Sequence, residues 1–125
     1  ALKQQALSGR FDAIVIAFPC STFSITRFFD ATSEDGGDRG PPIIRDVDHP
    51  DGLPDKDIDP KHLMELRNSN KLLDRTVELA IAARKSSART TIVVENPAGR
   101  SRGESIASSA EFERHGSLFR TSCIN

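Results

Sequence analysis

Two short apolar runs, separated by a long amphipathic segment, dominate the hydrophobic pattern of the chain. Residues 11–18 are almost continuously apolar, and residues 90–94 form a second run that is rich in β-branched side chains. Both runs have the length and composition of buried strands in a parallel sheet. We therefore expect the first run to be a strand covered on both faces, with Asp12 at its mouth, and the second to be a strand that ends at Glu95.

Between the two runs, apolar residues recur at helical spacing from Pro60 to about Lys85. Asp59 followed by Pro60 is typical of a helix start, because aspartate accepts from exposed amides and proline at the first position loses no hydrogen bond. Asn70 lies on the apolar side, where we interpret it as a hydrogen-bonded edge residue rather than a ligand contact. The predicted core face consists of Leu63, Leu66, Leu73, Val77, Ala80 and Ile81.

The order of these segments predicts an α/β fold. Residues 1–8 have the pattern of the end of a helix, and a strand, a helical crossover and a second strand follow. This is the order of a βαβ unit with parallel strands. Ligands of open parallel sheets bind beyond the carboxyl ends of the strands. Pro19-Cys20 and Glu95-Asn96-Pro97, which follow the two runs, are therefore expected to share one site although Cys20 and Glu95 are 75 positions apart.

Residues 31–59 are rich in Asp, Gly and Pro, which predicts a long acidic loop. Loops of this length inside compact domains are usually lids, binding loops or disordered segments. Residues 46–52 resemble the start of a calcium-binding loop, but the third acid is displaced by one position and the twelfth position is Asp57 instead of glutamate. We therefore favour a solvated acidic loop and expect no metal site.

Composition and charge fit a single domain, or part of one, spanning residues 1–125. The chain is 37% hydrophobic and has a formal net charge of -1, so it lacks the overall basic character of most non-specific DNA-binding proteins. The charge is nevertheless uneven, with six basic and eleven acidic side chains in residues 1–60 and eleven basic and seven acidic ones in residues 61–125. An anionic partner would meet the second half more favourably.

The cysteine content and hydropathy predict a soluble intracellular protein, either nuclear or cytoplasmic. Two cysteines are too few for a disulfide framework, and no apolar stretch has the length of a membrane span or a signal peptide.

The residues around Cys20 and Glu95 also resemble a known family. Residues 18–24, Phe-Pro-Cys-Ser-Thr-Phe-Ser, resemble the Pro-Cys loop of DNA cytosine-5 methyltransferases, and residues 94–97 resemble their Glu-Asn-Val motif with proline at its end. Arg27, the Gly-Leu-Pro at residues 52–54 and the Gly-Ser-Leu-Phe at residues 116–119 add to this order of motifs. The order is most similar to that of divergent family members found in mobile elements, and the resemblance covers about residues 7–120.

The resemblance implies part of a Rossmann-like class I methyltransferase fold that acts on DNA, or on RNA, with S-adenosylmethionine as the methyl donor. Cys20 would then attack cytosine C6 and Glu95 would engage ring N3, after the base is flipped out or presented in a single strand. We further predict that Pro19, Asn96 and Pro97 lie on the cofactor side, and that Ser24, Arg27, Arg100 and Arg102 contact nucleic acid.

Several of these residues also have a purely structural interpretation, in which they play no part in catalysis or binding. Cys20 has the alternative of an inert core cysteine, and for Arg100 and Arg102 we favour exposed positions in a solvated loop. The hydroxyl side chains of Ser21, Thr22 and Ser24 are also suited to cap a helix after the first strand.

One omission argues against a complete enzyme. Nothing before Phe11 supplies the Gly-rich loop or the ribose-binding acid of the cofactor half, so the chain resembles the second half of the fold. We therefore expect either a methyltransferase-like region whose cofactor half lies outside this chain, or an inactive remnant that serves as a structural or binding module, with protein partners covering its incomplete sheet. A cysteine hydrolase is a third alternative, but it needs a histidine beside Cys20, and none of the three histidines lies in such a motif.

Overall fold

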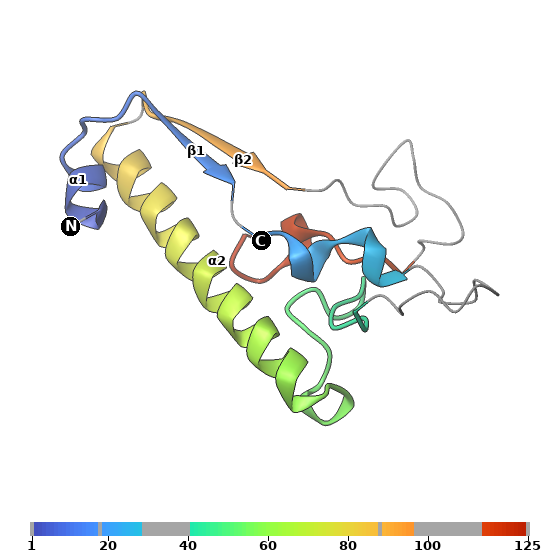
Figure 1. The fold of residues 1–125 in the computed structure, drawn as a ribbon. Coiled ribbons are helices and arrows are strands. Elements are labelled where there is room, and N and C mark those ends of the chain that lie inside the picture. Colours follow the sequence, from blue (N-terminus) through green and yellow to red (C-terminus); the bar gives the residue numbers. More distant parts are fainter. Residues whose placement is uncertain (1, 18, 29–40, 88, 97–113, 125) are drawn as a thin grey trace.

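The computed structural model describes residues 2–17, 19–28, 41–87, 89–96 and 114–124 (Figure 1). These described residues contain two α-helices and two strands in the order α1 (Leu2–Leu7), β1 (Ala13–Ala17), α2 (Pro60–Ser86) and β2 (Thr91–Glu95). They also contain short 3-10 turns at Ser21–Phe23, Ile25–Phe28, Asp55–Asp57 and Leu118–Arg120.

The two strands form a parallel pair, as the βαβ order predicts. Their register aligns Ala13 with Thr91 and Ala17 with Glu95, so both strands end at the same edge of the sheet. Helix α2 supplies the crossover and runs beneath the sheet (Figure 1). The chain is thus a mixed α/β unit in which one long helix connects and supports two parallel strands.

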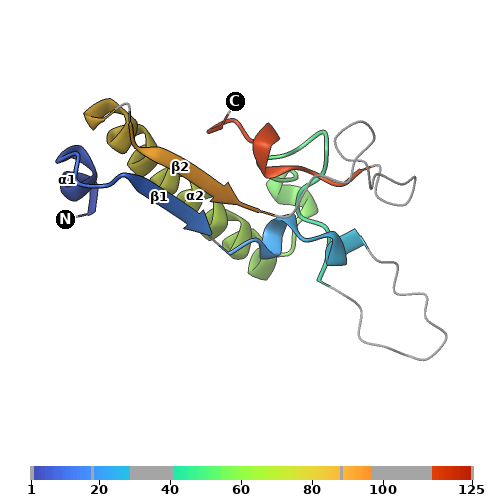
Figure 2. The same cartoon turned by 90° about the horizontal axis from the view of Figure 1, so that it is seen from above.

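Burial alternates along both strands, because α2 covers only one face of the sheet. Ile14, Ile16, Ile92 and Val94 pack toward α2 and its neighbours. On the other face Val15 and Val93 are exposed, and no described element covers them (Figure 2). The first strand is therefore covered on one face in the described structure, and not on both as its continuous apolar run predicts.

Helix α2 begins and ends where the sequence predicts. The Asp59 carboxylate accepts a hydrogen bond of 2.9 Å from the Lys61 amide, with Pro60 at the first helical position. Leu66 and Leu73 are buried as expected. Ile81, in contrast, is 49% exposed.

The helix buries alanines near its carboxyl end in place of Ile81. Ala82 and Ala83 are buried there against Ala6 of α1. Small side chains allow the two helices to approach closely, and this contact rotates the buried face of α2 away from the position that the apolar spacing predicts.

The described part of the acidic loop is not simply solvated, which corrects the prediction for this segment. Ile44 and Ile58 pack on Leu66 of α2, and Arg45 and Asp46 between them are also buried. Within residues 41–59 the loop therefore forms part of the core, whereas residues 31–40 lie outside the described structure.

Two further findings concern the described residues as a whole. They contain no group of three His, Cys, Asp or Glu side chains that could hold a metal ion. None of their helices has the length and apolar character needed to cross a membrane.

Candidate functional site

Strands β1 and β2, which lead into the Pro-Cys and Glu-Asn motifs, end at the same edge of the sheet. Glu95 is the last residue of β2 and pairs with Ala17, the last residue of β1. Cys20 follows Ala17 by three residues and lies directly before the 3-10 turn Ser21–Phe23. The parallel register thus brings the ends of two strands that are distant in sequence to one edge of the sheet (Figure 2).

Cys20 is a free, half-buried cysteine at the start of this turn. Its backbone has φ −96° and ψ 9°, in the sparsely populated bridge region where many active-site residues lie. The Cys20 carbonyl accepts a hydrogen bond of 2.8 Å from the Phe23 amide, which closes the turn. The thiol-bearing residue is therefore held by the backbone of a short, tight turn.

Glu95 lies on the open face of the sheet. Its side chain is exposed, and it follows the alternation that places Val93 on the same face and Val94 on the α2 side. Asn96, directly after it, is half-buried. A planar ligand that contacts Glu95 would therefore approach from the face that α2 does not cover.

A polar stripe on α2 anchors the turn that follows Cys20. The Ser21 hydroxyl lies 3.2 Å from Glu65 Oε1, and the Thr22 hydroxyl lies 2.9 Å from the Ser69 hydroxyl. Glu65 and Ser69 are four residues apart and hence on one side of the helix. The turn is thus fixed by side chains from the crossover helix as well as by its own backbone.

Arg27 is buried rather than available at the surface, with 3% of its side chain exposed. Its Nε donates to the Ser21 carbonyl at 2.8 Å, Nη1 donates to the Pro42 carbonyl at 2.8 Å, and Nη2 pairs with Glu65. A contact with nucleic acid would require the guanidinium to leave these three partners. The structure therefore gives Arg27 an internal bracing role and lends no support to the predicted phosphate contact.

Arg45 forms a second internal brace. Its guanidinium donates to the Asn70 amide oxygen and to the Pro50 carbonyl, and it lies 4.2 Å from the centre of the Phe23 ring. Burial lowers the pKa of Arg45 to about 10, while nearby Asp51 favours the charged form. Asn70 is thus a hydrogen-bonded structural residue, as predicted, and its partner is the arginine that covers Phe23.

The hydrogen-bond contacts of the three histidine rings are with groups other than the Cys20 thiol. His49 Nδ1 lies 2.9 Å from Asp46, and His62 Nδ1 lies 3.3 Å from Glu65. His115 is buried, with Nε2 2.9 Å from the Phe23 carbonyl. These contacts hold the turn and the loop together and give the hydrolase interpretation no support.

Asp46 is the fully buried carboxylate of the loop. Burial raises its pKa, but hydrogen bonds from His49 and Arg114 outweigh that effect and leave the pKa below its ordinary value of 3.8. Glu65 behaves alike, because hydrogen bonds from Arg27 and His62 outweigh burial and hold its pKa below 4.5. Both groups are therefore carboxylates at neutral pH and stabilise the fold in that form.

We expect the folded chain to lose stability in acid. A carboxylate with a depressed folded-state pKa contributes its stability above its unfolded-state pKa, and this contribution is lost as the pH falls through the folded-state value. The urea midpoint should therefore be nearly constant from pH 5 to 7 and fall below about pH 4. Asp46→Asn should flatten this fall, whereas Asp57→Asn, at an exposed position of the same loop, should leave it unchanged. An equal acid response of both variants would contradict the assignment.

Of the other predicted site residues, the structure describes Ser24 and Pro19. Ser24 accepts a hydrogen bond from the Thr26 amide and so starts the second 3-10 turn, where the sequence predicts a helix cap. Pro19 is exposed beside Cys20. The predicted contacts at Pro97, Arg100 and Arg102 lie outside the described residues.

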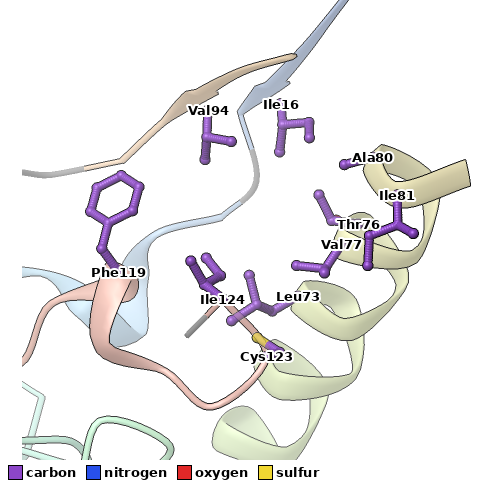
Figure 3. Close-up of a pocket in the computed structure, with 10 residues that line it drawn as sticks. All are labelled: Ile16, Leu73, Thr76, Val77, Ala80, Ile81, Val94, Phe119, Cys123 and Ile124. Atoms are coloured by element: carbon purple, nitrogen blue, oxygen red, sulfur yellow. The ribbon is translucent and has the colours of Figure 1, made fainter. Parts of the chain in front are cut away.

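An apolar cavity of about 280 Å³ lies on the α2 side of the sheet (Figure 3). Side chains from both strands, from α2 and from the end of the described chain surround it, and Phe119 and Ile124 face Leu73 and Val77 across it. Cys123 lies at its border. This cavity contains neither Cys20 nor Glu95, and its lining has no charged group.

The described residues do not by themselves fit S-adenosylmethionine. Both described strands already end in the Cys20 and Glu95 motifs, so no further strand is present there to carry a Gly-rich loop. Neither Pro19 nor Asn96 lines the apolar cavity. A cofactor pocket would need residues beyond those that the structure describes.

Sequence reasoning missed the residues that hold the turn. Glu65 and Ser69 are polar residues four positions apart that flank the apolar face of α2, and the sequence contains this spacing as a signal. Arg45 gave no such signal, because it lies in an acidic loop where an arginine is expected to be exposed.

No family model, curated protein or solved structure matches this chain.

Proposed function

We propose that this chain forms the cytosine-binding half of a cytosine-5 methyltransferase-like site, in which Cys20 is the nucleophile and Glu95 is its acid partner. In this proposal the two strands and α2 belong to a Rossmann-like class I methyltransferase sheet. The cofactor half, with S-adenosylmethionine, is supplied by additional polypeptide.

The observation that carries the proposal is the parallel register. It places Glu95 at the strand end next to the residues that lead into Cys20, and it leaves Glu95 on the uncovered face. A free cysteine three residues beyond the end of one strand and a carboxyl group at the end of its neighbour are the two groups that this chemistry needs to activate a cytosine ring. The order of the surrounding motifs supports the same conclusion.

The chemistry that these residues supply needs no cofactor. The Cys20 thiolate forms a bond to C6, and the π electrons of the C5=C6 bond move to C5, which takes a proton from water. The protonated carboxyl group of Glu95 assists by donating a hydrogen bond to ring N3, which draws electron density away from C6. Loss of the original C5 proton to solvent then restores the C5=C6 bond and expels the thiolate, so the net result is exchange of the C5 hydrogen.

This exchange provides the test. The full 125-residue chain is mixed with single-stranded DNA that carries tritium at cytosine C5, and tritium released into water is measured over time. We expect release at least about tenfold above that of the protein-free oligonucleotide. RNA of the same sequence distinguishes the two substrates. A folded protein that releases no tritium from either one would contradict the proposal.

A structural or binding module is the second candidate, and the open sheet face favours it. Val15 is 70% exposed and Val93 is 47% exposed on that face. Parallel sheets are nearly always covered on both faces, so a protein partner could complete this one. Isolation of the chain as a stable, soluble monomer without C5 exchange activity would contradict both candidates.

A further inference from the structure

We propose that Glu65 of α2 is a positioning residue for Cys20, which it holds in the reactive geometry through Ser21 and Arg27. This inference rests on the proposed function. It assigns a role to a residue that belongs to neither the Pro-Cys nor the Glu-Asn motif.

The first step is the convergence of contacts on one carboxylate. Glu65 Oε1 receives the Ser21 hydroxyl at 3.2 Å and the Arg27 guanidinium, while Oε2 lies 3.3 Å from His62. Ser21 is the residue directly after Cys20, and its carbonyl is a second acceptor for Arg27. Glu65 therefore holds the turn by two routes. It accepts directly from the Ser21 hydroxyl, and it pairs with Arg27, which donates to the Ser21 carbonyl.

The second step is the burial of Arg27. An arginine side chain that is only 3% exposed needs an opposite charge, because an unpaired buried charge is strongly unfavourable. Glu65 supplies that charge from a site 38 positions away in the chain. Without the carboxylate the guanidinium would turn toward solvent, and the Ser21 carbonyl would lose its donor.

The third step connects the turn to reactivity. Attack on a ring carbon requires the sulfur at close range and in line with the π orbital, and a displacement of about 1 Å can lower a rate by about 100-fold. The Cys20 backbone is set by the turn that Glu65 holds. Glu65 contacts Ser21, Arg27 and His62, so it acts through them rather than on a substrate.

The experiment measures two properties of the full chain with Glu65→Gln. The first is C5 exchange, for which we expect a fall in kcat of about 10- to 100-fold with KM within about twofold of the original. The second is the alkylation rate of each cysteine with iodoacetamide, followed by peptide mass spectrometry. We expect Cys20 to be alkylated several-fold faster, because its turn is looser, while Cys123 is unchanged and serves as the internal standard.

Two further variants make the result specific. Glu78→Gln removes another carboxylate of α2, one that pairs only with exposed cations at the surface, and it should change neither property. Ser21→Ala removes the hydroxyl contact with Glu65 but leaves the contact through Arg27, so it should have a smaller effect in the same direction as Glu65→Gln. This variant also tests the inference if Glu65→Gln fails to fold.

The outcomes separate this inference from the proposed function. Equal alkylation of Cys20 in Glu65→Gln, Ser21→Ala and the original chain would overturn the positioning role. Faster alkylation of both cysteines would indicate general loss of structure and would overturn it as well. If the original chain releases no tritium, the proposed function fails, while the selective change at Cys20 still decides whether Glu65 holds the turn.

Discussion

Replacing Cys20 by serine is expected to reduce tritium release from C5-labelled cytosine to the rate of the protein-free oligonucleotide. A serine hydroxyl is almost fully protonated near neutral pH and is a far weaker nucleophile toward a ring carbon than a thiolate. The side chains are close in size, and Cys20 is half-buried at the start of a turn rather than in the core. The fold should therefore persist, as circular dichroism can confirm.

Cys123 provides the matched control. It is also free and half-buried, but it borders the apolar cavity and contacts the Thr121 hydroxyl at 3.5 Å. Cys123→Ser should release tritium at the original rate. Retention of exchange in Cys20→Ser, or its loss in Cys123→Ser, would rule out Cys20 as the nucleophile.

Replacing Gly52 by alanine is expected to lower the free energy of unfolding by about 2–4 kcal/mol. Gly52 has φ +129°, a conformation that side-chain-bearing residues rarely adopt. An added Cβ would also lie 2.3 Å from Leu66 Cδ2, and Leu66 is buried against Ile44 and Ile58. Strain and overpacking act together at this position, and urea denaturation would measure their sum.

Gly9→Ala separates the two effects. Gly9 also has a positive φ, of +67°, but its nearest neighbour is the Ser86 hydroxyl at 3.1 Å rather than a packed core side chain. We expect a loss of about 1 kcal/mol there, from backbone strain alone. Equal losses in the two variants would show that the contact with Leu66 contributes nothing.

The features that the sequence predicted well depend on local signals. The start of α2 follows from Asp59 and Pro60, which act within one turn of the helix. The parallel pairing of the strands follows from their order and from the length of the crossover. The same topology predicts that the two strands end at one edge of the sheet, and the pairing of Ala17 with Glu95 confirms it.

The features that the sequence did not predict depend on tertiary packing. The pairing of Arg27 with Glu65 joins segments from different elements, and an arginine that follows a Pro-Cys loop has no local feature that marks it as buried. Val15 belongs to a continuous apolar run, which indicates burial on both faces, yet only one face has a described neighbour. The exposed Ile81 reflects the close approach of α1, which no spacing within α2 encodes.

Helix α2 contacts both the Cys20 turn and the main core cluster, and this constrains insertions and deletions in the helix. The helix presents Glu65 and Ser69 to the Cys20 turn and, one turn further along, buries Leu73 in the main core cluster. One added or deleted residue between Ser69 and Leu73 would rotate the two parts of the helix by about 100° relative to each other and shift them by about 1.5 Å. The segment from residue 65 to residue 73 should therefore tolerate substitution at its exposed positions but no change in length, because its length sets the position of the Cys20 turn relative to the core.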